Sequence, residues 1–398
     1  MTQKSKLVLE PCILCGSSDF EQTVLGASLA DASDFTNKDE KQSLFRYELV
    51  TCLSCNHSSI QTDNPCSVPI RKHDFIKYGE PTEHHSRILE ILKKLDLRSD
   101  DISIHTFSNK DFELANYIAS ELKIAKPELK DFAGCSGDWL PLVSSNGHIS
   151  EPLPLKNFIT EISESKKTHK IVLITRFFDH VHSRDLLQTI LKLSSPSTHI
   201  VFDLNDYDRL FELGTLEFIW NERRNFFSQK SLASLLTRAS AKFSMFTYES
   251  KTVSPTLTGV ISSRLPSAVN TTEKASSASA NTSLGDKLIA LRQRWKLELG
   301  LGHKLAIIGA SHKGISLAQF VLGPEVSFSL HDDKEVLKGK TPPAIPPLGF
   351  HSVSGFDFSD YTHLAITTTP IIAEKIIPKL RESGFTGQFL NFDCSSFN

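Results

Sequence analysis

Four cysteines near the start of the chain form two pairs that could hold a metal ion. Cys12 and Cys15 make one C-x-x-C unit, Cys52 and Cys55 make a second, and 36 residues separate the two units. Each unit places two sulfur atoms on one tight turn, and Gly16 directly follows the first unit. Four thiolates complete a tetrahedral zinc site without an open position, so the pattern predicts structural zinc. The alternative is four reduced, buried cysteines without a metal.

The long gap between the cysteine pairs predicts a small inserted lobe, because a minimal zinc ribbon needs fewer residues. The other cysteines, Cys66, Cys135 and Cys394, stand alone. The first residues lack the apolar core of a secretory signal, which predicts a cytoplasmic protein. In that compartment, paired cysteines favour metal binding over disulfides. His57 lies beside the second pair, but a site with four thiolates needs no fifth ligand.

The composition is typical of a soluble globular chain. It has 398 residues, of which 39% are hydrophobic and 23% charged, and its formal net charge is −2. The length suits two or three domains. The balanced charge argues against a broad basic surface, and no apolar run is long enough to span a bilayer. The sequence therefore predicts no nucleic-acid partner and no membrane partner.

The elements that must position any site alternate between strand patterns and helix patterns. Apolar strand patterns occupy 101–107, 170–178 and 198–204, and apolar residues at helical spacing occupy 112–124. Such alternation predicts a mostly parallel, doubly wound sheet with helices on its faces.

Two further segments, 242–250 and 258–265, are expected to close this sheet as an antiparallel pair. Residues 265–284 are rich in Ser, Ala, Thr and Asn, a composition that predicts a linker. A second α/β pattern follows, with its first strand at 304–310. The expected organisation is a zinc-binding module over 1–75, a central domain over 76–264, the linker over 265–284 and a Rossmann-like domain over 285–398.

The stretch DFAGCSGDWL, residues 131–140, has the glycines of a cofactor loop. Gly134 and Gly137 would let the backbone approach a nucleotide closely. In a class I methyltransferase-like fold, however, two helix–strand units separate that loop from the fourth strand, here 170–178. Gly137 lies too close to 170–178 to leave room for them. The cofactor loop is therefore expected at 106–113, which contains no glycine.

Several motifs resemble those of the sugar C-methyltransferases, enzymes that act on nucleotide-activated deoxysugars. The most specific is IIGASHKGISLAQF (307–320), which is similar to the family's GAS-x-KG loop and is followed by LHDD and KGKTPPAIPPLGF. The paired cysteines and YGEPTEHHSRIL (78–89) are similar as well. The resemblance covers nearly the whole chain. It implies an α/β fold with an N-terminal zinc-binding module, a class I methyltransferase-like doubly wound sheet and a C-terminal Rossmann-like domain.

The resemblance also implies catalytic residues. The segment TRFFDHVHSRD places His180 on a family histidine, and IWNERRNFFSQKSL places Glu222 on a family glutamate. The family's usual catalytic histidine falls on Arg223, which stays protonated and could hold an enolate or a diphosphate instead of accepting a proton. His180 is then the expected base, oriented by Glu222, with His182 as a competitor. Tyr78 is expected to line the substrate site.

The remaining expected contacts belong to two small-molecule sites. The methyl donor is expected to contact Phe107, Ser108, Lys110, Asp111, Arg176 and Phe177. The substrate is expected to contact His84, Gly309, Ser311, Lys313, Gly314 and Asp332. Asp111 could also cap the helix that follows it. The alternative for Arg176, Phe177 and Tyr78 is ordinary packing, and the alternative for both loops is an ordinary strand–helix turn.

Together these features predict a C-methyltransferase that depends on S-adenosyl-L-methionine and contains structural zinc. Its substrate would be a nucleotide-activated keto-deoxysugar or a similar small molecule. A base would remove a proton next to the ketone, and the enolate carbon would take the methyl group. The alternative is a catalytically degenerate relative that binds a nucleotide sugar or a protein partner without methyl transfer. A monomer or a homodimer is expected.

Overall fold

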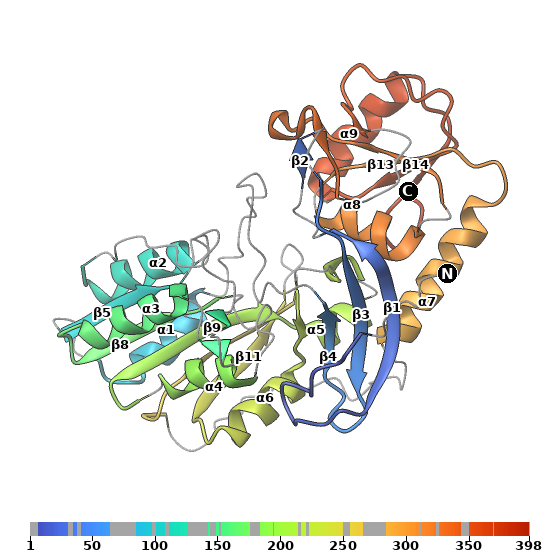
Figure 1. The fold of residues 1–398 in the computed structure, drawn as a ribbon. Helices are drawn as coiled ribbons and strands as arrows, with labels where there is room; N and C mark the ends of the chain where they lie inside the picture. Colours follow the sequence, from blue (N-terminus) through green and yellow to red (C-terminus); the bar gives the residue numbers. More distant parts are fainter. Residues whose placement is uncertain are drawn as a thin grey trace.

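The chain folds into several sheets with helices packed against them, as the ribbon of the computed structural model shows (Figure 1). The structure describes residues 7–30, 35–37, 41–63, 85–97, 101–107, 111–125, 127, 142–143, 149–150, 153–175, 184–193, 195–213, 216–219, 223–249, 255–265, 284–310, 312–323, 326–343, 350–368 and 370–397. This part of the chain is an α/β protein with a four-cysteine cluster near its N-terminal end.

The N-terminal residues form an antiparallel sheet. β1 (Phe20–Leu29) pairs with β3 (Phe45–Cys52), and β3 pairs with β4 (Ser58–Thr62). The next strand in this sheet is β10 (Asn225–Phe226), which comes from the middle of the chain. The β1–β3 hairpin lies between the two cysteine pairs, and it is the inserted lobe that the long gap predicted.

The central sheet has the strand order β11-β12-β9-β8-β5 in the described residues. Its strands are β5 (Ile102–Thr106), β8 (His169–Leu173), β9 (Thr198–Asn205), β11 (Phe243–Tyr248) and β12 (Thr256–Ile261). β5, β8 and β9 are parallel, whereas β12 is antiparallel to both β9 and β11. The predicted closing pair is therefore confirmed, and its last strand lies inside the sheet rather than at the edge.

Helices cover both faces of the central sheet, because apolar side chains alternate along its strands. Val172 and Phe202 face one layer of helices, and Ile171 and Val201 face the other. The first layer contains α3 (Leu153–Glu164), α4 (Arg184–Lys192) and α6 (Gln229–Arg238). The second layer contains α1 (His85–Lys93) and α2 (Phe112–Leu122).

The C-terminal sheet is parallel throughout its described strands, in the order β16-β14-β13-β17-β18. Its strands are β13 (Leu305–Ile308), β14 (Phe328–His331), β16 (Phe350–His351), β17 (His363–Ile366) and β18 (Gln388–Leu390). Chain order reverses between β13 and β17, the point of an open α/β sheet where ligands bind. α7 (Leu284–Leu299), α8 (His312–Ser316), η5 (Leu317–Leu322) and α9 (Pro370–Glu382) pack around it.

The inserted hairpin also reaches the C-terminal part of the chain, as Figure 1 shows for β2 near α9. β2 (Thr36–Asn37) pairs with β15 (Lys340–Thr341). Gln42 Nε2 donates a hydrogen bond of 2.9 Å to the carbonyl of Pro342. Gln319 Nε2, on the C-terminal side, donates to the carbonyl of Ala30 over 3.3 Å. The N-terminal part of the chain thus bonds to the central part through β10 and to the C-terminal part through the segment between β1 and β3.

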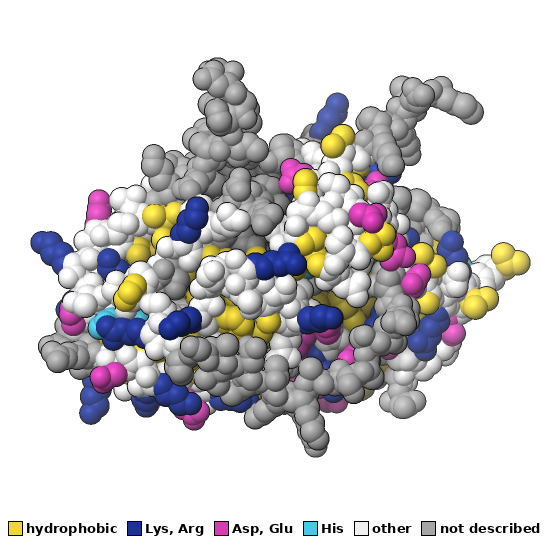
Figure 2. Space-filling view, turned by 90° about the horizontal axis from the view of Figure 1, so that it is seen from below, with side chains coloured by type: hydrophobic (Ala, Val, Ile, Leu, Met, Phe, Trp, Pro, Cys, Tyr) yellow, Lys and Arg dark blue, Asp and Glu magenta, His cyan; other side chains and the backbone are white. Residues whose placement is uncertain are grey.

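The outer surface carries charges of both signs. On the face in Figure 2, Lys and Arg side chains are interspersed with Asp and Glu among the described residues. None of the helices in the described ranges has the length and apolar character needed to cross a bilayer. The expected absence of nucleic-acid and membrane partners stays a prediction.

Asp111 joins the carboxyl ends of β5 and β8. Its Oδ2 accepts a 2.8 Å hydrogen bond from the backbone N–H of Phe107, and its Oδ1 accepts from both the backbone N–H and the Oγ1 of Thr175. The carboxyl group is fully buried. The predicted helix cap is wrong: Asp111 occupies the N-cap position of α2, but its side chain turns away to the strand ends and makes no cap hydrogen bond.

We expect Asp111→Asn to lower the free energy of unfolding by about 3 kcal/mol, because the amide would present a donor to a buried N–H or hydroxyl. Urea unfolding followed by circular dichroism measures the change. The matched control is Glu113→Gln, an exposed side chain on the same helix, which should change stability by less than about 0.5 kcal/mol. Equal stability of Asp111→Asn and the wild type would contradict this role.

Two buried histidines are held in their neutral form. Nδ1 of His199, in β9, lies 2.8 Å from Ser262 Oγ. Nε2 of His331, in β14, lies 2.8 Å from Ser329 Oγ. Burial is the main cause that lowers the pKa of each ring to about 4, and His169 and Arg264 lower that of His199 further. Below about pH 6.5 the unfolded chain therefore binds protons that the folded chain does not bind.

Stability should consequently fall as the pH decreases from about 6.5 to about 4, by up to about 3 kcal/mol for each ring. Thiol protonation at the cysteine cluster adds to acid unfolding, so the test compares wild type with His199→Asn. That variant should reduce the slope of unfolding free energy against pH, measured in urea between pH 5 and 6. The reduction should correspond to close to one bound proton. An unchanged slope would show that His199 is not held neutral.

Candidate functional site

The four paired cysteines come together in a compact cluster. Cys12 Sγ lies 3.6 Å from Cys55 Sγ, and Cys15 Sγ lies 3.5 Å from Cys52 Sγ. All of these sulfur atoms lie within 4.8 Å of one another. Zinc–sulfur bonds of about 2.3 Å in a tetrahedron separate the sulfurs by about 3.8 Å. The donor set and its spacing therefore fit a structural zinc ion.

The two C-x-x-C turns have the same backbone shape. In the first, the N–H of Gly16 donates to the carbonyl of Cys12 over 2.8 Å, and in the second the N–H of Asn56 donates to the carbonyl of Cys52 over 2.8 Å. Gly16 and Asn56 both have positive φ, at 78° and 63°. Glycine and asparagine are the residues that adopt this left-handed conformation most readily. Asn56 is therefore the counterpart of the glycine noted after the first pair.

Hydrogen bonds shift the pKa values of the thiols in the cluster. The hydrogen bond between the sulfurs of Cys55 and Cys12 lowers the pKa of Cys12 and raises that of Cys55. Backbone N–H groups of Leu14 and Cys15 also donate to the Cys12 sulfur and lower its pKa. Burial raises the pKa of Cys52. A zinc ion would replace the protons that the other sulfurs retain.

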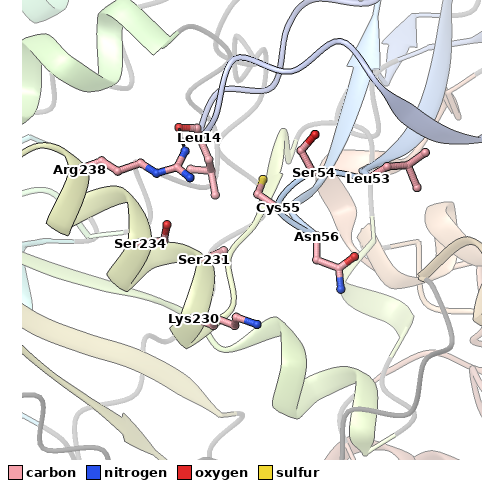
Figure 3. A pocket seen from close by; sticks show the side chains of 9 residues that line it. All are labelled: Leu14, Leu53, Ser54, Cys55, Asn56, Lys230, Ser231, Ser234 and Arg238. Atoms are coloured by element: carbon pink, nitrogen blue, oxygen red, sulfur yellow. Dashed lines mark hydrogen bonds between the residues drawn. The ribbon is translucent and has the colours of Figure 1, made fainter.

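A polar cavity of about 460 Å³ separates the cysteine turns from α6. Figure 3 shows Lys230, Ser234 and Arg238 on its α6 side, opposite Cys55 and Asn56. The three α6 residues share one face because they are spaced four apart in a helix. Arg238 Nη1 also donates to the carbonyl of Leu14 over 3.2 Å. A zinc ion with four thiolates would carry net negative charge, and the cations Lys230 and Arg238 line the same cavity as Cys55.

His57 connects the cysteine cluster to the central part of the chain. It is buried, its Nε2 lies 3.1 Å from Asn225 Oδ1, and its ring centroid lies 5.1 Å from that of Phe227. Burial lowers its pKa, so the neutral ring donates its Nε2–H to Asn225. The described metal-ligand group contains only the four cysteines, in agreement with the expectation that His57 is not a ligand.

A second cluster brings together Arg223 and Lys313, which the sequence placed in different sites. The Arg223 guanidinium carbon lies 5.7 Å from the ring centroid of Phe218, and Lys313 Nζ lies 5.6 Å from the same centroid. Lys313 Nζ also lies 3.0 Å from Glu217 Oε1. Arg223 is buried and hydrogen-bonds the hydroxyl of Tyr207. Two cations from separate sheet units therefore lie near one aromatic ring, at distances typical of cation–π contacts.

Lys313 follows a tight loop at the end of β13. Gly309 has a φ of 104°, and a Cβ on Gly314 would lie 1.9 Å from the carbonyl oxygen of Gly309. Both positions thus require glycine. Asp332, at the end of β14, accepts a 2.7 Å hydrogen bond from the N–H of Ala310, so it closes on this loop. Gly309, Gly314 and Asp332, three of the expected substrate residues, therefore belong to one strand–helix turn, which carries Lys313. Their contact with a substrate stays a prediction.

Other expected residues are placed differently or lie outside the described ranges. Phe107 is buried, and its ring packs edge-on against Phe158 at 5.1 Å. Asp111 hydrogen-bonds Phe107 and Thr175 at the ends of β5 and β8, as described above. The expected site residues outside the described ranges are Tyr78, His84, Ser108, Lys110, Arg176, Phe177, His180, Ser311 and Glu222, together with the competitor His182.

Sequence reasoning missed the partners that surround Arg223. Tyr207, Glu217 and Phe218 lie between the third parallel strand and the segment that carries Arg223. Glu217 and Phe218 immediately precede the family-like segment IWNERRNFFSQKSL, and that proximity was the available signal. Nothing in the spacing of Asn225 indicated its contact with His57.

We expect one zinc ion per chain. Titration of the native protein with an organomercurial, with a zinc-sensitive dye as readout, should release the metal as the four clustered thiols react. Cys52→Ser should reduce zinc content well below one per chain because it removes a buried ligand. The matched control is Cys394→Ser, a buried cysteine outside the cluster, which should leave zinc content unchanged. Full zinc retention by Cys52→Ser would contradict the site.

Two clusters of polar side chains thus stand out among the described residues. The cysteine cluster fits zinc in its donors and distances, and the second cluster brings Arg223 and Lys313 near one aromatic ring. Comparison of the sequence with models of known protein families finds no match, and comparison with curated proteins also finds none.

Proposed function

We propose that this protein is a C-methyltransferase that uses S-adenosyl-L-methionine and acts on a nucleotide-activated keto-deoxysugar or a similar substrate. The observation that carries the proposal is the strand order of the central sheet. Three parallel strands are followed by a hairpin whose last strand, β12, runs antiparallel between β9 and β11. A class I methyltransferase-like sheet closes in this way. The motifs similar to the sugar C-methyltransferases support the same assignment.

The methyl donor would bind where the parallel strands β5 and β8 end. Ligands of α/β sheets bind at the carboxyl ends of the strands. Asp111 bonds the N–H groups of Phe107 and Thr175, the last described residues before the segments 108–110 and 176–177. Asp111 would thus position both segments, and Ser108, Lys110, Arg176 and Phe177 within them would contact the cofactor. S-adenosyl-L-methionine supplies an electrophilic methyl group when bound.

The residues of the chain would then supply the acid–base and electrostatic parts of the reaction. His180 would remove the proton next to the ketone through a ring nitrogen, with Glu222 as its orienting partner. Arg223 cannot accept that proton, but its fixed charge would stabilise the enolate oxygen or a diphosphate. Lys313 lies near the same Phe218 ring and would bind the anionic part of the substrate. Zinc would be structural, because its four thiolates leave no open position.

A second candidate function is binding of a nucleotide sugar without methyl transfer. The observation that favours it is the burial of Arg223 against Tyr207, at the position where the related enzymes have a histidine. A base at this position would need a pKa near neutrality, and arginine does not provide one. The two candidates differ in whether the cofactor binds and turns over.

Calorimetry with S-adenosyl-L-methionine separates these candidates. The methyltransferase proposal predicts binding, and it predicts release of S-adenosylhomocysteine when nucleotide-activated 4-keto-deoxysugars are added. His180→Ala should lower that release at least 100-fold, because general-base catalysis contributes about that factor. His303→Ala, in the C-terminal part of the chain, is the matched control and should retain activity. No binding at millimolar cofactor would favour the second candidate. Full activity of His180→Ala would show that His180 is not the base.

A further inference from the structure

The segment that carries Arg223 is part of the zinc-module sheet. Asn225 and Phe226 of β10 pair with Ser59 and Ser58 of β4, and the N–H of Ile60 donates to the carbonyl of Arg224 over 2.9 Å. β10 has only two residues, so this short ladder and a few side-chain contacts determine its position. β4 in turn begins three residues after Cys55, the last ligand of the cysteine cluster.

His57 occupies the short connection between the cluster and β4. Its backbone N–H donates to the sulfur of Cys55, and its side-chain Nε2 lies 3.1 Å from Asn225 Oδ1. Both side chains are 2% exposed, so the hydrogen bond is shielded from water. One residue therefore contacts a metal ligand with its backbone and β10 with its side chain.

The opposite side of β10 packs on the central part of the chain. Phe226 meets the ring of Tyr207 edge-on, with centroids 4.8 Å apart, and the N–H of Tyr207 donates to the carbonyl of Phe227 over 3.2 Å. Tyr207 is also the residue whose hydroxyl bonds the Arg223 guanidinium. The location of Arg223 thus depends on how β10 is held between β4 on one side and α5 (Tyr207–Glu212) on the other.

We propose that the second cysteine turn positions the Arg223 segment, and that His57 is the positioning residue through its hydrogen bond to Asn225. When metal holds Cys52 and Cys55, the turn fixes His57 and the start of β4, and these fix β10. The zinc centre would then help to position the Arg223–Lys313 cluster without contacting the ligand. What Arg223 binds rests on the proposed function, but the coupling of the cysteine turn to β10 does not.

Hydrogen–deuterium exchange of the zinc-loaded full chain, read by mass spectrometry, tests this coupling. His57→Phe keeps an aromatic ring against Phe227 but removes the donor to Asn225. It should keep one zinc per chain and speed exchange of the amides of 223–228 at least tenfold. His57→Gln places an amide nitrogen near the position of the ring Nε2 and should restore slow exchange. Peptides covering β13 and β14, in the other sheet unit, are the internal control and should not change.

A purely structural role for His57 would lower stability without this local pattern. Equal exchange of 223–228 in the wild type and in zinc-loaded His57→Phe would overturn the proposal, as would equally fast exchange in His57→Phe and His57→Gln.

If His57→Phe loses zinc, Asn225→Leu becomes the test variant for the coupling, because it leaves the cysteine turn unchanged. That variant should retain zinc and show the same faster exchange of 223–228, and protection equal to the wild type would overturn the proposal. Removal of zinc from the wild type with a chelator should also speed exchange in 223–228. These measurements need no cofactor or substrate, so failure of the methyltransferase proposal would appear separately, in the calorimetry.

Discussion

The pairing of β10 with β4 is the interaction on which the arrangement of the candidate site depends. It adds a two-residue strand from the middle of the chain to the N-terminal sheet, next to the second cysteine turn. The segment between β1 and β3 reaches the C-terminal part, where β2 pairs with β15 in a separate two-stranded sheet. The N-terminal part of the chain therefore contacts both the central and the C-terminal parts. A four-thiolate metal site would add stability at the cysteine turns.

This linkage explains why the Arg223–Lys313 cluster can exist. Arg223 lies between the central strands β9 and β11, and Lys313 follows the first strand of the C-terminal sheet, so neither unit alone contains both cations. Phe218 provides an apolar surface near both, and Glu217 balances the charge of Lys313. Both cations therefore lie near one ring only because the central and C-terminal parts of the chain pack together here.

Buried polar groups decide the local geometry in both larger sheets. Asp111 satisfies the N–H groups at two strand ends, and Asp332 satisfies an N–H in the loop after β13. Each carboxylate joins neighbouring parallel strands at the edge where ligands of α/β folds bind. The resemblance predicts that Asp111 contacts the methyl donor and that Asp332 contacts the substrate, and both contacts stay predictions. In this chain their oxygen atoms accept hydrogen bonds from backbone N–H groups, which ties the described ends of neighbouring strands together.

The sequence alone determined the features that depend on residue type and short spacing. The C-x-x-C pairs predicted the cysteine cluster, and the alternating patterns predicted the parallel strands and the closing pair. Only the tertiary structure decided which distant residues meet. The His57–Asn225 contact spans 168 residues, and the short β10 has no periodicity that a pattern could reveal. Such contacts arise from the packing of whole sheets, so no local propensity encodes them.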